Sequence, residues 1–380
     1  MNKAIKLMTP GPTQVRENVR MARSYVTTNP DLDLTFYEEY KAICDNLSQL
    51  LHTNHPSYIL SGEGILGLEA ACASLTEPGD RVLVLDNGIF GKGFADFVKI
   101  YGGEPVLYTV SDRKAIDVEA LAAYLAHDHN FKYATVVHCD TPTGVLNPIE
   151  QICPLLKRYG ILTVVDAVAS MFGVEIDIDK CQVDILCGGS QKALSAPPGL
   201  TMLTVSKDAI QTMEQRKTPI ASFYANILTF KNYYADKWFP YTMPISDIYG
   251  LGAALDNVLA DKNIYLRHAQ IAQAVRMAAV KAGLKLYLDN DYCPTVTVIE
   301  VPEGVDSARF LQHMTDTYGI MIAGCFDYLA GKVFRLGHMG EGANAADVSA
   351  MLDAMDKTFF DLGHVLKCSM RDVFEKEMHI

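Results

Sequence analysis

Three features are missing from the sequence: a Cys-x-x-Cys pair, a run of basic residues, and an apolar run long enough to span a bilayer. The 33 Lys and Arg residues against 45 Asp and Glu residues give a formal net charge of −12, which disfavours nucleic acid and anionic membranes as partners. The nine cysteines are an odd number and lie mostly in apolar segments, which is typical of a reducing compartment. Because the first residues also lack the apolar core of a signal peptide, we expect a cytoplasmic protein. Because the chain as a whole is acidic, any bound phosphate must be held by a favourable local arrangement of residues around it.

The length and the order of the elements predict an α/β protein of roughly two domains. With 380 residues, 49% of them hydrophobic, the chain can bury a sizeable core. Strand and helix signals alternate from about 58 to 205, which indicates a doubly wound, mostly parallel sheet with ligands at the carboxyl ends of its strands. We therefore expect an N-terminal segment lining the active site (1–20), a large domain (21–258) and a smaller C-terminal α+β domain (259–380).

One lysine stands out between two small-residue turns. The apolar run 184–187 predicts a short buried strand, and Gly188, Gly189 and Ser190 are expected to turn the chain so that Gln191 and Lys192 face a cavity. Burial lowers the pKa of an amine and frees its lone pair for a carbonyl carbon, which is what a Schiff base to pyridoxal phosphate (PLP) requires. The alternative is an ordinary solvated surface lysine.

An aspartate ends the apolar run 161–166. A charge there costs several kcal/mol unless it is paired, so Asp166 should have a cationic partner. A pyridinium nitrogen would serve, and so would a structural salt bridge. Val168 lies two residues further on the same side, where it could pack beneath a flat ring.

Three more expected strand ends carry residues suited to a ligand. Ser61-Gly-Glu-Gly64 joins a strand to a helix, which makes either an anion site or a plain helix cap; Glu63 would repel a phosphate, so its side chain is expected to turn away. Phe90 falls in a glycine-rich turn, as a stacking ring or a core anchor. Cys139-Asp-Thr-Pro-Thr-Gly144 offers hydroxyls to a pocket, or is an ordinary turn.

Outside these strand ends, four features have more than one interpretation. Thr9-Pro-Gly-Pro-Thr13 predicts a rigid loop, either lining a pocket or leading into the fold. His52 and His55 lack an accompanying carboxylate, so we expect no metal site. The aromatic-rich region 218–249 suits a subunit interface or its own core. Arg335 is expected to point inward, towards a substrate carboxylate or a buried ion pair.

Taken together, these pieces resemble the class V aminotransferases of PLP fold type I, the group of alanine–glyoxylate and serine–pyruvate aminotransferases. The matching stretches run in order along nearly the whole chain: Thr9-Pro-Gly-Pro12, Ser61-Gly-Glu-Gly64, Leu68-Glu-Ala-Ala71, Asn87-Gly-Ile-Phe-Gly91, His138-Cys-Asp-Thr-Pro-Thr-Gly144, Asp166-Ala-Val-Ala-Ser170, Gly189-Ser-Gln-Lys-Ala-Leu194, Thr242-Met-Pro244 and Gly331-Lys-Val-Phe-Arg-Leu-Gly337.

The resemblance implies a role for each matching residue. Lys192 would be the Schiff-base lysine and the proton shuttle, and Asp166 would keep the pyridine nitrogen protonated. The remaining implied cofactor contacts are Phe90 and Val168 on the ring faces, Thr141 at the ring edge, and Glu63, Gly64, Ile65, Gln191 and, from the neighbouring subunit of a homodimer, Thr242 around the phosphate. Arg335 would bind the substrate carboxylate, with Gly11 beside the substrate.

Three positions depart from the family pattern. Phe90 stands where the animal enzymes often have Trp, Phe239 stands where close relatives have a tyrosine, and Glu63 replaces a small hydroxyl residue at the phosphate. Tyr241 could supply the phosphate contact that Phe239 lacks.

The resemblance therefore predicts a homodimeric PLP transaminase acting between a small amino acid, of the alanine or serine type, and glyoxylate or pyruvate. The alternatives are a 2-aminoethylphosphonate–pyruvate transaminase, a cysteine desulfurase-like lyase that uses Cys325, and a PLP-binding protein without turnover.

Overall fold

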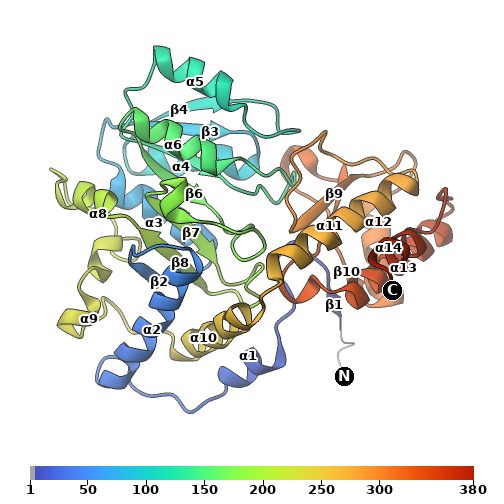
Figure 1. Cartoon of the computed structure of the whole chain (residues 1–380), viewed down its shortest axis with the longest axis horizontal. Helices are drawn as coiled ribbons and strands as arrows, with labels where there is room; N and C mark the ends of the chain where they lie inside the picture. Colours follow the sequence, from blue (N-terminus) through green and yellow to red (C-terminus); the bar gives the residue numbers. More distant parts are fainter. Residues whose placement is uncertain (1–4) are drawn as a thin grey trace.

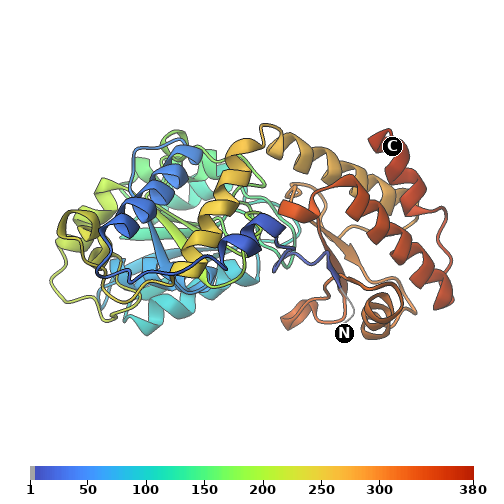
Figure 2. The same cartoon turned by 90° about the horizontal axis from the view of Figure 1, so that it is seen from below.

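The structure, a computed structural model, describes residues 5–380 and consists of a larger and a smaller body joined by two long helices. Figure 2 shows the two bodies side by side, with the segment after the N-terminus crossing from the smaller body to the larger one. A seven-stranded sheet with the order β2-β8-β7-β6-β5-β3-β4 forms the centre of the larger body. Its strands are β2 (Ser57–Ser61), β3 (Arg81–Asp86), β4 (Glu104–Thr109), β5 (Tyr133–Val137), β6 (Leu162–Asp166), β7 (Ile185–Gly189) and β8 (Leu200–Val205).

Six of these strands run in the same direction. β8 pairs antiparallel with both β2 and β7, while β3, β4, β5, β6 and β7 pair parallel with their neighbours, so β2 also points the same way as β7. The carboxyl ends of six strands therefore meet at one edge of the sheet, as expected for a doubly wound fold. β5, β6 and β7 are buried along their whole length, which explains their continuous apolar runs.

Helices cover both faces of this sheet, as the two cartoon views show. They are α1 (Glu17–Ala22), α2 (Leu34–Leu50), α3 (Gly64–Leu75), α4 (Ile89–Ile100), α5 (Val118–His127), α6 (Ile149–Arg158), α7 (Ile178–Cys181), α8 (Lys207–Glu214), α9 (Tyr233–Asp236) and α10 (Ile245–Ala260). The apolar residues Phe36, Tyr40 and Leu47 of α2 recur at helical spacing and are buried in the main core.

The smaller body has a separate apolar core. It contains α11 (Ile264–Lys281), β9 (Val296–Glu300), α12 (Ser307–His313), β10 (Ile320–Met321), β11 (Val333–Gly337), α13 (Ala345–Asp361) and α14 (Met370–Met378). β9 and β11 form an antiparallel pair, and β1 (Lys6–Leu7) pairs parallel with β10. The rings of Phe310, Phe334 and Phe359 pack together in this core. The boundaries at 20/21 and 258/259 stay predictions.

Two local predictions need correction. Gly188 and Gly189 continue β7 instead of turning the chain, because they pair with Met202 and Thr201 of β8. Phe90 lies in the first turn of α4 and not in a turn outside a helix. These element boundaries are set by backbone contacts, through strand pairing or at a helix start. The side-chain types alone do not determine them.

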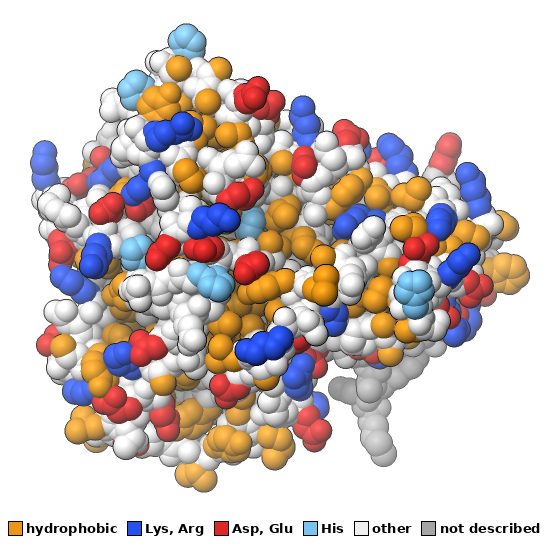
Figure 3. Space-filling model, viewed as in Figure 1, with side chains coloured by type: hydrophobic (Ala, Val, Ile, Leu, Met, Phe, Trp, Pro, Cys, Tyr) orange, Lys and Arg blue, Asp and Glu red, His pale blue; other side chains and the backbone are white. Residues whose placement is uncertain are grey.

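The described chain contains no helix long and apolar enough to cross a membrane. All nine cysteines are free thiols. On the face that Figure 3 shows, acidic and basic side chains are interspersed, and neither sign forms a large patch of its own. The cytoplasmic location stays a prediction.

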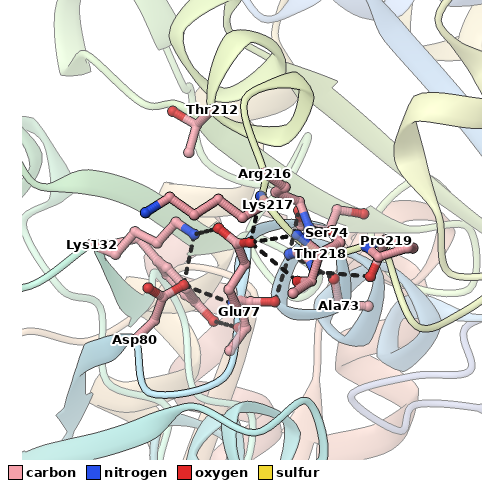
Figure 4. A network of polar contacts seen from close by, with 12 residues as sticks. Ala73, Ser74, Glu77, Asp80, Lys132, Thr212, Arg216, Lys217, Thr218 and Pro219 are labelled. Atoms are coloured by element: carbon pink, nitrogen blue, oxygen red, sulfur yellow. Dashed lines mark hydrogen bonds and ion pairs between the residues drawn. The ribbon is translucent and has the colours of Figure 1, made fainter.

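A paired polar network ties α3 to α8 and the segment after it (Figure 4). Oε1 of Glu77 accepts hydrogen bonds from the backbone N–H of Lys217 and Thr218, at 2.7 and 2.9 Å. Nζ of Lys132 lies 3.1 Å from Glu77 and 2.6 Å from Asp80. Arg216 donates to the backbone carbonyls of Ser74 and Thr76 at the end of α3, at 3.1 and 2.5 Å. The charged side chains of Glu77, Asp80, Lys132 and Arg216 therefore all have polar partners.

Candidate active site

A cavity of about 140 Å³ lies at the carboxyl edge of the sheet. Its lining consists of Glu63, Gly64, Ile65, Leu68, Phe90, Cys139, Thr141, Asp166, Val168, Ala169, Gln191 and Lys192. Every predicted cofactor residue except Thr242 is therefore brought together by the ends of β2, β3, β5, β6 and β7. A larger hollow of about 770 Å³ lies beside α6, but its carboxylates include the helix caps Asp117 and Asp177, which already have backbone partners.

The amine of Lys192 is enclosed at the floor of this cavity. Its Nζ donates a hydrogen bond to the carbonyl oxygen of Pro10, 2.6 Å away. Burial, helped by the positive charge of Arg335, lowers the pKa of Lys192 from 10.5 to about 8, and the negative charge of Asp166 only partly opposes this. A larger fraction of the amine is therefore unprotonated near neutral pH than for a solvated lysine, and an unprotonated amine is a nucleophile and a base. The interpretation of Lys192 as a solvated surface charge is wrong.

The N-terminal loop is fitted around this lysine. Gly11 has φ of +99°, and a Cβ at this position would lie 2.3 Å from Cδ of Lys192, so no residue but glycine fits there. The hydroxyl of Thr13 donates to the carbonyl of Lys192 at 2.9 Å, and its N–H donates to the carbonyl of Gln191 at 3.0 Å. The loop therefore lines the site, while a contact between Gly11 and substrate stays a prediction.

Asp166 is a buried carboxylate without a cationic partner. It is 5% exposed, and Oδ1 accepts a hydrogen bond from the N–H of Val168 at 2.9 Å. No residue between 5 and 380 forms an ion pair with it, so the interpretation as a structural salt bridge is wrong. Burial raises the pKa of Asp166 to about 7. The carboxylate of Asp166 lines the cavity and suits a positively charged or protonated nitrogen, as the PLP ring would provide.

The faces of a planar ring would meet Phe90 and Val168. The N–H of Phe90 donates to Oδ1 of Asp140 at 3.1 Å, and Thr143 donates to the other oxygen of the same buried carboxylate at 2.9 Å. This anchoring fixes the first turn of α4 and with it the ring of Phe90. On the opposite side, a Cβ at Gly64 would lie 2.7 Å from Val168, so glycine allows α3 to approach β6 closely.

Glu63 occupies the start of α3, where the anion site was predicted. Its Oε1 accepts from the N–H of Ile65 at 3.2 Å, and its Oε2 accepts from Nε2 of Gln191 at 3.1 Å. The prediction that this side chain turns away is therefore wrong. The physical reason is that the free N–H groups and positive dipole end of a helix attract the carboxylate of the protein itself. One end of the cavity already carries a negative charge.

Arg335 lies in β11 with most of its donors unengaged. Its Nε donates to the carbonyl of Gly324 at 2.6 Å, and its Cζ lies 5.7 Å from the ring centre of Phe326. Burial lowers the pKa of Arg335, and within residues 5–380 no carboxylate pairs with it. The alternative of a buried ion pair is wrong, and the remaining N–H groups fit a substrate carboxylate.

The predicted partner-subunit residue lies away from this cavity. Thr242 is exposed and its hydroxyl lies 3.5 Å from Oδ2 of Asp31. Phe239 packs into the core of its own chain, stacked 4.6 Å from Tyr37. The hydroxyl of Tyr241 accepts from the N–H of Ser61 at 3.4 Å, near the end of β2. The aromatic-rich region thus contributes partly to its own core, while its role in an interface stays a prediction.

Two sets of residues complete this description. The sequence reasoning missed Leu68, Cys139 and Ala169 in the cavity lining and the carbonyl of Pro10; all of them lie beside singled-out residues.

Burial raises the pKa of Cys325, so its thiol is not activated as a nucleophile. Among residues 5–380 no group of three or more His, Cys, Asp or Glu could hold a metal, and His52 and His55 lie 3.7 and 3.9 Å from single carboxylates.

Comparison with known proteins identifies the family. The pattern of the aminotransferase class V family matches residues 15–327. The chain is 36% identical to the pyridoxamine–pyruvate transaminase of Mesorhizobium japonicum, over 86% of this chain and 84% of that protein. It is 30% identical to the alanine–glyoxylate aminotransferase of Callithrix jacchus, over 92% and 86% of the two chains.

Solved structures agree with this assignment. The crystal structure of pyridoxamine–pyruvate aminotransferase from Mesorhizobium loti superposes with a TM-score of 0.94 at 32% identity and covers 99% of this chain and 97% of that one. An unpaired carboxylate facing a cavity across from a lysine with a lowered pKa fits the pyridine ring that this family binds. The chain is a class V aminotransferase with the PLP fold type I architecture.

Proposed function

We propose that the protein is a PLP-dependent transaminase that moves an amino group between a small amino acid, such as alanine or serine, and a small 2-oxo acid, glyoxylate or pyruvate. The observation that carries this is the placement of three charged groups around one site, the buried Asp166 and the half-buried Lys192 and Arg335, none of which has an ion-pair partner among residues 5–380. The relatives named for alanine–glyoxylate and serine–glyoxylate transamination support the substrate class.

Each group has a distinct task in this proposal. When bound, PLP supplies the electron sink that allows the Cα–H bond of an amino acid to break. The freed amine of Lys192 accepts that proton and returns it during the same half-reaction, for which its lowered pKa is suited. Asp166 holds a proton at the ring nitrogen, Phe90 and Val168 restrain the ring between them, and Arg335 orients the substrate carboxylate.

Purified protein mixed with PLP, alanine and glyoxylate should form glycine and pyruvate in equal amounts. A donor panel with serine, cysteine and 2-aminoethylphosphonate separates this proposal from the lyase and the phosphonate transaminase. Borohydride reduction should add the mass of the cofactor to the peptide that contains Lys192, and the Lys192→Ala variant should not react. If no donor yields an amino acid from any oxo acid while the peptide is labelled, the protein binds the cofactor without turnover.

A second candidate function is favoured by Glu63: transamination between free pyridoxamine and pyruvate. A phosphate carries about two negative charges near neutral pH, and at the start of α3 it would face the carboxylate of Glu63. An uncharged hydroxymethyl group at the same place could instead donate a hydrogen bond to this carboxylate. The relative from Mesorhizobium japonicum and the solved structure from Mesorhizobium loti carry this activity in their names.

The two candidates differ in which form of the ring the site prefers. If Glu63 repels the phosphate, wild-type protein should bind pyridoxal more tightly than PLP in an absorbance titration, and Glu63→Gln should shift the ratio of the two dissociation constants at least about tenfold towards PLP. Glu69→Gln is the matched control, because Glu69 lies on the same helix but accepts its hydrogen bond from Tyr101 outside the cavity. A preference for PLP in wild type that Glu63→Gln leaves unchanged would reject the second candidate.

We also propose that the active protein is a homodimer in which Thr242 reaches the site of the other subunit. Exposed apolar side chains occur close together in the chain, from the end of α1 to the start of α2: Met21, Tyr25, Val26, Leu32 and Leu34. Sedimentation should give a dimer, and Val26→Glu with Leu32→Glu should produce monomers with weakened cofactor binding. A monomer that turns over at full rate would reject this arrangement.

A further inference from the structure

The ring of Phe326 bridges the two parts of the substrate site. It packs edge-to-face with the ring of Phe90, with centroids 6.2 Å apart and an interplanar angle of 72°. Cζ of Arg335 lies 5.7 Å from the ring centre of Phe326. Phe326 is 45% exposed and belongs to the segment that joins β10 to β11, so it comes from the smaller body while Phe90 belongs to the larger one.

The segment that carries this ring is held at both ends. Before it, the carbonyl of Gly324 accepts the hydrogen bond from Nε of Arg335 at 2.6 Å. After it, the hydroxyl of Tyr328 donates to the carboxylate of Asp112 in the larger body. The hydroxyl of Tyr287 donates to the same carboxylate at 2.6 Å. A half-exposed ring held between such contacts has a fixed position relative to Phe90 and Arg335, which a loose surface side chain would not have.

We propose that Phe326 determines the size of the amino donor. This inference rests on the proposed transaminase function. A substrate whose carboxylate is held by Arg335 and whose Cα lies within reach of Lys192 would place its side chain next to the ring of Phe326, because that ring lies beside Arg335 and packs against Phe90. Alanine and serine fit beside a fixed phenyl ring, and longer side chains collide with it or displace it. One methylene more or less against such a wall changes kcat/KM by roughly 10- to 200-fold.

The closing experiment compares Phe326→Ala with wild type on alanine, 2-aminobutyrate and norvaline, at saturating oxo acid. The ratio of kcat/KM for norvaline to that for alanine should rise at least about tenfold in Phe326→Ala. The change should appear mainly in KM for norvaline, because Lys192 and Asp166 are untouched. Phe223→Ala is the matched control, since Phe223 is also exposed (59%) but its ring packs against that of Tyr224, away from Phe90 and Arg335. It should leave the ratio unchanged.

A binding measurement gives a second readout that does not depend on turnover. Calorimetric titration of cofactor-loaded protein with acetate, butyrate and hexanoate should show affinity falling with chain length in wild type and no longer falling in Phe326→Ala. If alanine reacts in both proteins but neither the kcat/KM ratio nor the order of affinities changes, Phe326 does not set the size limit. If no amino acid reacts with wild type, the proposed function itself fails, whatever the carboxylates do.

Discussion

Two polar clusters in the larger body contain similar side chains but differ in how they are paired. Glu77, Asp80 and Lys132 form contacts of 2.6 to 3.1 Å with one another and with neighbouring backbone. Lys192 and Asp166 form no ion pair within the described part of the chain, although both are enclosed. The first cluster joins segments of the fold, and the second leaves its charges available to a bound molecule.

The pKa values show the same contrast. Burial opposes ionisation of Glu77, but hydrogen bonds from Thr218, Lys132 and Lys217 outweigh it and lower the pKa to about 2. For Asp166 burial dominates, and the pKa rises to about 7. A buried charge that the fold itself does not neutralise lowers the stability of the protein without ligand, and it is the arrangement expected at functional sites. The comparison predicts that substitutions in the second cluster abolish activity and those in the first destabilise the fold.

The largest effect is expected for Lys192→Ala. Because this amine is the only one among the side chains that line the cavity, its loss should lower kcat for transamination at least about 1,000-fold. The stability should not fall, since the variant removes a buried, poorly solvated amine. Steady-state rates and urea unfolding of the ligand-free protein measure both. A variant that keeps more than a tenth of the activity would remove Lys192 from the mechanism.

Asp166→Asn is expected to have the next largest effect on activity. The amide cannot hold a positive charge at the ring nitrogen, so kcat should fall about 100-fold. The folded-state pKa of Asp166 is raised from 3.8, so its contribution to stability is greatest below pH 3.8 and is lost as the pH rises through about 7. At pH 8 the ligand-free variant should therefore be at least as stable as wild type. A large loss of stability at pH 8 would instead show that Asp166 is structural.

The sequence alone predicts the positions of candidate site residues that lie at the end of a strand or in the turn after it. Lys192 and Asp166 both end apolar runs of a parallel sheet, and parallel strands bring their carboxyl ends together, so their convergence could be predicted. The doubly wound fold followed from the same alternation. Phe90 lines the cavity, but the sequence assigns it to a turn, because the glycines around it are as compatible with a helix start as with a loop.

Contacts that depend on distant packing could not be predicted. The carboxylate of Glu63 had two possible directions; besides the helix start, it is held by Gln191, more than a hundred residues away in the chain, and no local pattern shows that contact. Phe326 meets Phe90 only because the two bodies pack against each other, and no local pattern contains that information. Thr242 would act from a second chain, which no pattern within one chain positions.

Glu77→Ala tests the paired cluster and should have the opposite effect: it should lower the stability of the fold and leave the activity nearly unchanged. It leaves Lys132 with only Asp80 and removes the acceptor for two backbone N–H groups, which should cost about 2 kcal/mol of unfolding free energy. The activity per folded molecule should stay within about twofold of wild type, because the cluster does not line the cavity. Urea unfolding alongside Glu104→Ala, an exposed glutamate of β4, provides the control. A loss of activity without a loss of stability would contradict the contrast between the clusters.

The smallest effect is a difference in how stability depends on pH. The pKa of Lys192 is lowered in the folded state from its ordinary 10.5 to about 8, so the unfolded chain binds more protons between these values. The contribution of Lys192 to stability is therefore present above pH 10.5 and is lost as the pH falls through about 8. Between pH 8 and 9, the ligand-free wild type should gain about 1 kcal/mol relative to Lys192→Met, since one pH unit corresponds to at most about 1.4 kcal/mol for one proton. Unfolding curves of the two proteins at half-unit pH steps measure this difference. If the unfolding free energies of the two proteins change with pH in parallel, the amine is solvated. The contrast between the unpaired and the paired cluster would then fail.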